Sequence, residues 1–238
     1  MIILAGLIVF LSQLVKGFTG FGSGMFAMPF LLWFFDIKFA LAFTILLDLA
    51  SGSMMLSKER KEAKKEVLTT VIAGLLLGAI IGGLLLPKID SIVLKRLFGA
   101  VIVLMSAHML IESKTTAGII RKRLWGTITG TIAGLTGVLF GVNGPPIVYF
   151  ANQTCNDKTQ LRATLYAIFL ADSALRTVTY LATGIINLEI VTFAAMMLPF
   201  TILGILAGNR IHHKTDEKTY KKTITILILI AGITTILK

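Results

Sequence analysis

Long apolar segments follow one another along the whole chain, and this pattern restricts what it can fold into. Residues 37–56, 67–86, 92–111, 161–182 and 190–208 each approach the roughly 20 residues that a helix needs to cross a hydrocarbon core about 30 Å thick. Only short charged stretches separate them. Of the 238 residues, 55% are hydrophobic and 15% charged, against about 25% charged in a typical soluble domain. The sequence therefore predicts an all-α, multi-pass integral protein of the cytoplasmic membrane.

Two glycine-rich stretches, at 17–24 and 134–144, lie among shorter apolar segments. The segment that follows the first stretch, 25–35, has 11 residues and would be about 16 Å long as a helix. Such a helix reaches only part of the way across the bilayer. We therefore expect each glycine stretch to form the tip of a broken-helix hairpin, at 1–35 and 124–151, that enters the membrane and returns to the same side.

The chain also contains an internal duplication. The segment GFTGFGSGMFAMP (17–29) aligns without a gap with GLTGVLFGVNGPP (134–146), and further along Asp48 matches Asp172. The expected organisation is a first repeat at 1–113, a basic cytoplasmic linker at 114–123 and a second repeat at 124–238. Each repeat has one hairpin and three transmembrane helices, at 37–56, 67–86 and 92–111 in the first repeat and at 161–182, 190–208 and 223–237 in the second.

The distribution of basic residues favours repeats of opposite orientation. A re-entrant hairpin plus three crossings gives an odd number of crossings, so the second repeat would be inverted. One face of the membrane then receives 16 of the 23 Lys and Arg residues and the other face receives 5. Repeats of the same orientation would split them almost evenly. Because cytoplasmic loops are rich in Lys and Arg, the sequence predicts inverted-topology repeats with both termini on the non-cytoplasmic side.

The two glycine tips are the expected site for a small anionic substrate. Helices that restart after the breaks, near Met25 and Pro145, would present free N–H groups and positive dipole ends to an anion. The candidate substrate-binding residues are the tip glycines and their polar neighbours: Lys16, Thr19, Gly20, Gly22, Gly24, Thr136, Gly137, Gly141, Asn143, Gly144 and Pro145. In the alternative interpretation these glycines only permit close helix packing, as expected for the G-x-x-x-G pairs Gly78/Gly82, Gly130/Gly134 and Gly204/Gly208.

Four charged residues fall within the apolar spans, where each costs roughly 2.5 to 3.5 kcal/mol on insertion scales. Lys16 adjoins the first tip and suits an anionic substrate, although a structural ion pair or snorkelling would also explain it. Asp172 and Arg176 have the i, i+4 spacing of a mutually neutralising pair. Asp48 has no such local partner, so it is a candidate for proton coupling unless Lys16 or Arg176 reaches it. His108 is expected at the cytoplasmic interface.

Several other function classes find no support in the sequence. The net charge of +11 arises from short loops between apolar segments, where basic residues set topology, so nucleic-acid binding is not expected. The single cysteine, Cys155, excludes an internal disulfide and a Cys-based metal cluster. No H-E-x-x-H, G-x-S-x-G or P-loop motif occurs, so we expect neither an enzyme nor a cofactor. A secondary anion transporter is the leading interpretation, and a passive anion channel is the alternative.

The duplicated segments GFTGFGSG and GLTGVLFGVNGPP, together with Arg162-Ala163-Thr164 at a later helix start, resemble the sulfite exporter TauE/SafE family. The resemblance covers the whole chain. It implies a permease with eight or more segments that moves small sulfur-containing or organic anions, such as sulfite, sulfoacetate or related sulfonates. The positions that match the family's glycine motifs are Gly20, Gly24, Gly137, Gly141, Gly144 and Pro145. The first motif has Met25-Phe26-Ala27 after Gly24 where the second has Asn143-Gly144-Pro145, so the two tips need not contribute equally.

Overall fold

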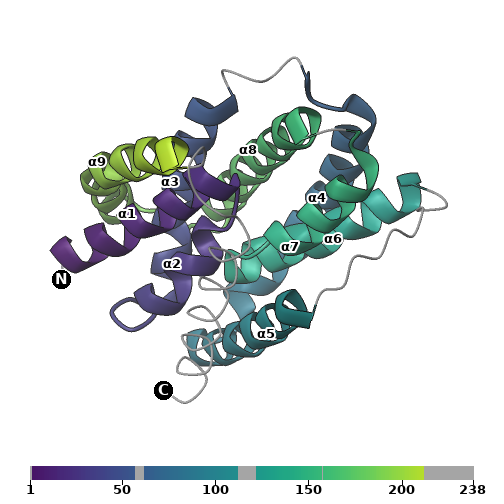
Figure 1. Cartoon of the computed structure of the whole chain (residues 1–238). Coiled ribbons are helices and arrows are strands. Elements are labelled where there is room, and N and C mark those ends of the chain that lie inside the picture. The colour runs from purple at the N-terminus through teal and green to yellow at the C-terminus, as the bar shows by residue number, and fades with distance from the viewer. Residues whose placement is uncertain (1, 57–61, 112–121, 157, 212–238) are drawn as a thin grey trace.

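The computed structural model describes residues 2–56, 62–111, 122–156 and 158–211, and these form helices and connecting turns without a strand. The helices are α1 (Ile2–Thr19), α2 (Ser23–Leu31), α3 (Ile37–Leu56), α4 (Lys65–Leu85), η2 (Leu86–Lys88), α5 (Ser91–Ile111), α6 (Lys122–Phe140), α7 (Gly144–Thr154), α8 (Lys158–Ala182) and α9 (Leu188–Ile211) (Figure 1). The helix expected at 223–237 lies outside the described residues. His108 lies near the end of α5.

The predicted all-helical membrane protein is confirmed for the described residues. Four of their helical stretches are long and apolar enough to cross a membrane: Ile2–Thr19, Ile37–Met55, Lys65–Lys88 and Leu188–Arg210. Large apolar side chains on the outside of the bundle remain uncovered, among them Leu84, Ile92 and Leu203. In water so much exposed apolar surface would cause aggregation, whereas lipid tails cover it in a bilayer.

Both glycine stretches break a helix. α1 ends at Thr19, and α2 begins three residues after Gly20, at Ser23. Gly22, which caps the start of α2, has φ +87°, a left-handed conformation that favours glycine. Between α6 and α7 Gly141 is also left-handed, with φ +71°, and Asn143 caps the start of α7. Each break joins a long helix to a short one, of 9 residues in α2 and 11 in α7, and the two helices pack against each other.

Glycines also bring the long helices into backbone contact. α1 packs along α9, and α4 packs along α6. A Cβ atom added to Gly204 or Gly208 would overlap a backbone carbonyl of α1, and one added to Gly74 or Gly78 would overlap a carbonyl of α6. Gly130, on α6, faces the backbone of α4 in the same way. The structure thus places the G-x-x-x-G glycines at helix contacts, where small residues allow backbones to approach.

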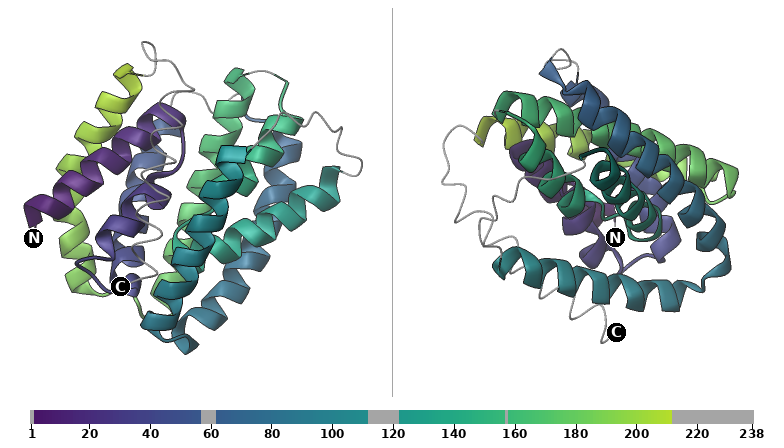
Figure 2. Two further views of the ribbon diagram at one scale, coloured as in Figure 1. Left: turned by 60° about the horizontal axis from the view of Figure 1, so that its bottom comes forward. Right: turned by 90° about the vertical axis from the view of Figure 1, so that its right-hand side faces the viewer.

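The helices assemble into two groups that mix the two halves of the chain. The first group contains α1, α2, α3 and α9, and the second contains α4, α6, α7 and α8. In Figure 2 (left) α1 and α9 lie together on one side of the molecule, and α4 and α6 lie on the other. The groups meet mainly where α3 packs against α8, and α5 contacts both. Helices from both halves of the sequence therefore form each group.

Candidate functional site

A small cavity lies where the two helix breaks meet, between the two groups of helices. Its volume is about 390 Å³, including the open space at its mouth. The first group contributes Lys16 from α1, residues 21–25 around the start of α2, and Asp48 from α3. The second group contributes residues 141–145 around the start of α7, with Phe169, Ser173 and Arg176 from α8. The sequence thus brings two distant glycine stretches to one site.

The two tips are in direct contact beside this cavity. A Cβ atom on Gly24 would overlap the carbonyl oxygen of Gly141, and a Cβ atom on Gly144 would lie 2.9 Å from the ring of Phe21. Glycine at these positions therefore allows the backbone of one tip to approach the other tip closely. The N–H groups of Ser23, Gly24 and Met25 in the first turn of α2 have no partner within that helix. In the first turn of α7 Gly144 carries such an N–H group, whereas Pro145 and Pro146 carry none, and the first turns of both helices line the cavity.

A buried lysine–aspartate pair holds the first tip. The Lys16 Nζ atom lies 2.7 Å from Asp48 Oδ1 and donates a further hydrogen bond of 2.8 Å to Ser51 Oγ. Ser23, the first residue of α2, donates to the same Asp48 oxygen at 2.7 Å. The sequence left Lys16 and Arg176 as possible partners of Asp48, and in the structure Lys16 forms the ion pair. The pair joins α1 to α3, and Ser23 fastens the start of α2 to it.

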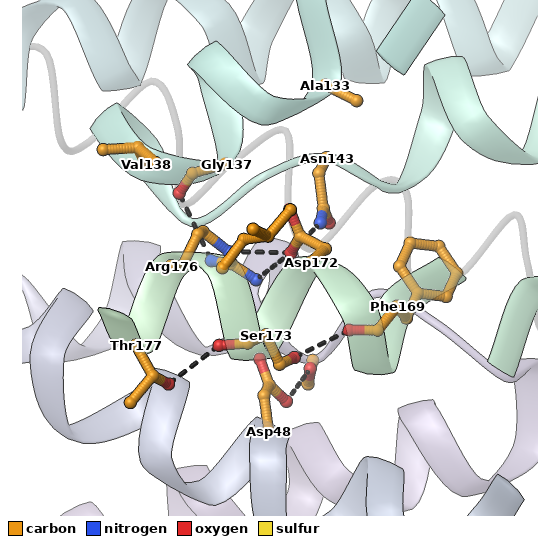
Figure 3. A network of polar contacts seen from close by, with 12 residues as sticks. Asp48, Ala133, Gly137, Val138, Asn143, Phe169, Asp172, Ser173, Arg176 and Thr177 are labelled. Carbon is orange, nitrogen blue, oxygen red and sulfur yellow. Dashed lines mark hydrogen bonds and ion pairs between the residues drawn. The ribbon is translucent and has the colours of Figure 1, made fainter. Parts of the chain in front are cut away.

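A second buried network holds the other tip (Figure 3). The Arg176 Nε and Nη2 atoms both lie 2.7 Å from Asp172 Oδ2, and the Asn143 side-chain amide donates to that oxygen as well. Arg176 Nη1 donates to the carbonyl oxygen of Gly137 at 3.2 Å, and the Tyr180 hydroxyl donates to the carbonyl oxygen of Val138 at 2.7 Å. The neutralising pair expected from the i, i+4 spacing is therefore present. It also fixes the end of α6.

The two networks have the same plan. Asp48 and Asp172, which align in the duplicated sequence, each accept a hydrogen bond from a residue of one tip, Ser23 for Asp48 and Asn143 for Asp172. The cation differs: a lysine on the preceding broken helix pairs with Asp48, and an arginine on the same helix pairs with Asp172. Charges buried this deeply are stable only when they are paired and hydrogen-bonded, and both aspartates meet this condition.

Most of the predicted site residues line the cavity, and five do not. Lys16, Gly22, Gly24, Gly141, Asn143, Gly144, Pro145, Asp48 and Arg176 line it. Thr19 and Thr136 instead bond to carbonyl groups near them in the chain, because a threonine on a helix readily bonds to the preceding turn. Gly20 faces the Tyr166 ring. Gly137 and Asp172 contact Arg176, which lines the cavity, but do not line it themselves.

The sequence interpretation missed six lining residues and one neighbour. Phe21, Ser23, Met25 and Val142 belong to the tip segments but carry no glycine or charge that would single them out. Phe169 and Ser173 precede Arg176 by seven and three residues, a helical spacing that places all three on one face of α8. That spacing was the available signal. Gln13 donates to Asp48 Oδ1 at 3.4 Å, and no spacing in the sequence indicates this residue, because the contact joins α1 to α3.

A helical membrane protein with a polar cavity between two helix breaks has the architecture of a membrane transport protein. Among the described residues, no group of His, Cys, Asp and Glu side chains has the arrangement of a metal site. The sulfite exporter TauE/SafE family matches residues 5–235, and the chain belongs to this family.

Two relatives agree with this assignment. The probable sulfite/organosulfonate exporter TauE of Cupriavidus necator is 25% identical over 199 residues, which cover 81% of this chain and 77% of that protein. The probable inner membrane transporter protein TsaS of Comamonas testosteroni is 21% identical over 194 residues, which cover 79% of each. No solved structure gives a significant match. The family resemblance expected from the glycine motifs is confirmed, and the chain is a multi-pass membrane transporter of an anion-exporting family.

Proposed function

We propose that this protein moves a small sulfur-containing or organic anion across the cytoplasmic membrane as a proton-coupled secondary transporter, with the cavity between the tips as its substrate site. The observation that carries this proposal is the lining of the cavity. Two buried cations, Lys16 and Arg176, and the first turns of α2 and α7 all face it. Helix N-termini and cations are the groups that stabilise an anion away from bulk water.

The relatives and the size of the cavity support the proposed substrate class. One relative is named as an exporter of sulfite and organosulfonates. A sulfonate or sulfite group has three oxygens around one sulfur, so it can accept hydrogen bonds from both tips at once. The cavity is small, which favours sulfite, sulfoacetate and similar compounds over large organic anions. Binding by the tip residues Gly22, Gly24, Gly141, Gly144 and Pro145 is part of this proposal.

Inverted repeats and alternating access complete the proposed mechanism. The helix pairs support the repeats: α1 with α9 corresponds to α6 with α4, and α3 with α9 corresponds to α8 with α4, when the first half is superimposed on the second. Because each group of helices mixes both halves, we propose that the two groups rock against each other, rather than one repeat against the other. The cavity between them then opens to alternate sides.

Flux measurements in proteoliposomes test this function. Sulfite, thiosulfate, sulfoacetate and short carboxylates are compared with and without an imposed pH gradient. We expect saturable flux of sulfite or a sulfonate that a pH gradient drives uphill. A transmembrane conductance with the single-channel steps of an open pore would instead establish the passive anion channel. Empty liposomes, and liposomes with heat-denatured protein, provide the background.

A further inference from the structure

The charges around the cavity balance one another. Lys16 and Arg176 are positive, Asp48 and Asp172 are negative, and three of these four residues, Lys16, Asp48 and Arg176, line the same cavity. An anion entering such a site would add a negative charge that nothing compensates, in surroundings where unpaired charge is costly. A positive charge must therefore enter the site together with the anion, or Lys16 or Arg176 must leave its aspartate and pair with the anion.

The other groups that face Asp48 do not alter this balance. Gln13 and Ser23, from α1 and α2, are neutral. α9 packs on α3 with Phe193, whose ring lies 5.0 Å from that of Phe43. The buried side chains of α5, within its described part, are Leu94, Phe98 and Ile102. From α8, Asp172 and Arg176 are already counted, and Ser173 is neutral.

The two ion pairs differ in how easily the cation can leave. Arg176 holds Asp172 with two N–H groups and the Gly137 carbonyl with a third, so its release would free the end of α6. Lys16 holds Asp48 with one ammonium group, and it also donates to Ser51 Oγ and to the Asp48 carbonyl oxygen at 3.2 Å. These two bonds remain if the carboxylate contact is lost. Asp48 lines the cavity, whereas Asp172 does not.

Gln13 has the properties of a partner for both charge states of Asp48. Its side chain is 3% exposed and lies one turn before Lys16 on α1. Its Nε2 atom donates to Asp48 Oδ1 at 3.4 Å, but its Oε1 atom is buried without a hydrogen-bond partner among the described residues. Turning the amide by half a rotation therefore breaks only one long hydrogen bond. It brings Oε1 to Asp48, where it accepts a hydrogen bond from a protonated carboxyl group.

We propose that Asp48 binds the coupled proton, that Gln13 is a positioning residue that accepts the hydrogen bond of protonated Asp48, and that Lys16, once released, donates to the anion. This proposal rests on the transport function above. A proton from water forms an O–H bond at Asp48 Oδ1, the contact of that oxygen with Lys16 is lost, and the Lys16 N–H group that made this contact turns to the anion. One proton enters with each monoanion, so the loaded cavity has the same net charge as the empty one.

Binding of methanesulfonate and sulfite to the purified protein tests the proton step. In weakly buffered solution, wild type should take up about one proton per methanesulfonate bound, and its affinity should fall about tenfold per pH unit once Asp48 is ionised. Asp48→Asn should bind the anion without proton uptake and without this pH dependence. For sulfite, which itself exchanges protons near neutral pH, the difference between wild type and Asp48→Asn gives the uptake by the protein.

Gln13→Met tests the positioning role and does not depend on Asp48→Asn folding. It should keep the pH slope of wild type but bind about threefold to tenfold more weakly, the value of one hydrogen bond. When Gln13→Met is combined with Asp48→Asn, its effect on anion affinity should be the same at every pH. The matched control is Ser12→Ala, next to Gln13 on α1, because the Ser12 hydroxyl donates to the Val9 carbonyl of its own helix. Its binding should equal that of wild type.

Three results would overturn the inference and leave the transport function intact. In the first, Asp48→Asn takes up as many protons as wild type. In the second, proton uptake is lost in Asp172→Asn but not in Asp48→Asn. In the third, Gln13→Met binds the anion as wild type does at every pH. If the wild type neither binds nor transports sulfite or any sulfonate, the proposed function itself fails.

Discussion

Arg176 is the residue on which the buried charge of the second tip depends. Replacing it by glutamine leaves Asp172 ionised in an apolar interior and removes the bond to the Gly137 carbonyl. Breaking one partner of a buried pair typically costs about 3–5 kcal/mol. We expect Arg176→Gln to lower the free energy of unfolding by about this amount, measured by chemical denaturation in detergent. The control is Arg123→Gln, because the Arg123 side chain is exposed.

The double variant distinguishes the effect of the buried charges on stability from the effect of side-chain packing. Asp172→Asn combined with Arg176→Gln removes both charges, so it should recover most of the stability lost in Arg176→Gln alone. Recovery also requires that the new amide at position 172 still accepts the hydrogen bond that Asn143 donates to Asp172 in the wild type. If the double variant is as unstable as the sum of the two single variants, the charges do not stabilise each other and the network acts through packing alone.

At the scale of the helices, glycine contacts decide which elements lie together. A Cβ atom at Gly78 would overlap the Thr131 carbonyl of α6, so Gly78→Ala must push α4 and α6 apart. A Cβ atom at Gly52 would meet Leu170 at 3.4 Å, an ordinary contact. We expect Gly78→Ala to reduce the thermal midpoint clearly. Gly52→Ala should leave it unchanged or raise it, because alanine favours a helix by about 0.5–1 kcal/mol over glycine. Equal losses in both variants would contradict this account.

The sequence predicted individual elements better than their partners. The long helices follow from the length of the apolar segments, which is why the expected span 37–56 coincides with α3 (Ile37–Leu56). The breaks follow from glycine runs. The contact between Lys16 and Asp48, 32 residues apart, could not be read from spacing along one helix. The packing of α9 with helices of the first half, and of α4 with helices of the second half, could not be predicted either. Both halves have apolar helix faces that could pack against either half.

The distribution of charge predicts the orientation of the whole molecule in the membrane, and labelling tests this prediction. In a background with Cys155→Ser, single cysteines replace Glu62 and Arg123 on the proposed cytoplasmic face and Lys88 and Asn187 on the opposite face. Glu62, Arg123, Lys88 and Asn187 are all exposed. The first two should react with an impermeant maleimide only after the cytoplasmic side is opened, and the last two in intact cells. Labelling of Lys88 and Asn187 from opposite sides would exclude the inverted repeats, because the two positions share a side only if the second hairpin does not cross the membrane.

The interlaced helix groups make a prediction about which parts of the molecule move. If the groups rock against each other, a disulfide between α3 and α8 should block transport, whereas one within a group should not. The Cβ position of Gly52 lies 3.8 Å from that of Leu170 on the other group, and the Cβ position of Gly83 lies 3.9 Å from that of Thr179 in its own group. Both distances are near the roughly 3.8 Å typical of a disulfide.

The two cross-links therefore differ in position but have similar Cβ–Cβ distances. In the Cys155→Ser background, oxidised Gly52→Cys/Leu170→Cys should lose transport in proteoliposomes and regain it on reduction. Oxidised Gly83→Cys/Thr179→Cys should transport at the rate of its reduced form, because α4 and α8 belong to one group. Full transport by the first cross-linked variant would show that α3 and α8 stay together during the cycle. The boundary between the moving groups would then lie between other helices. Cross-links that leave transport intact would identify the helices that move together.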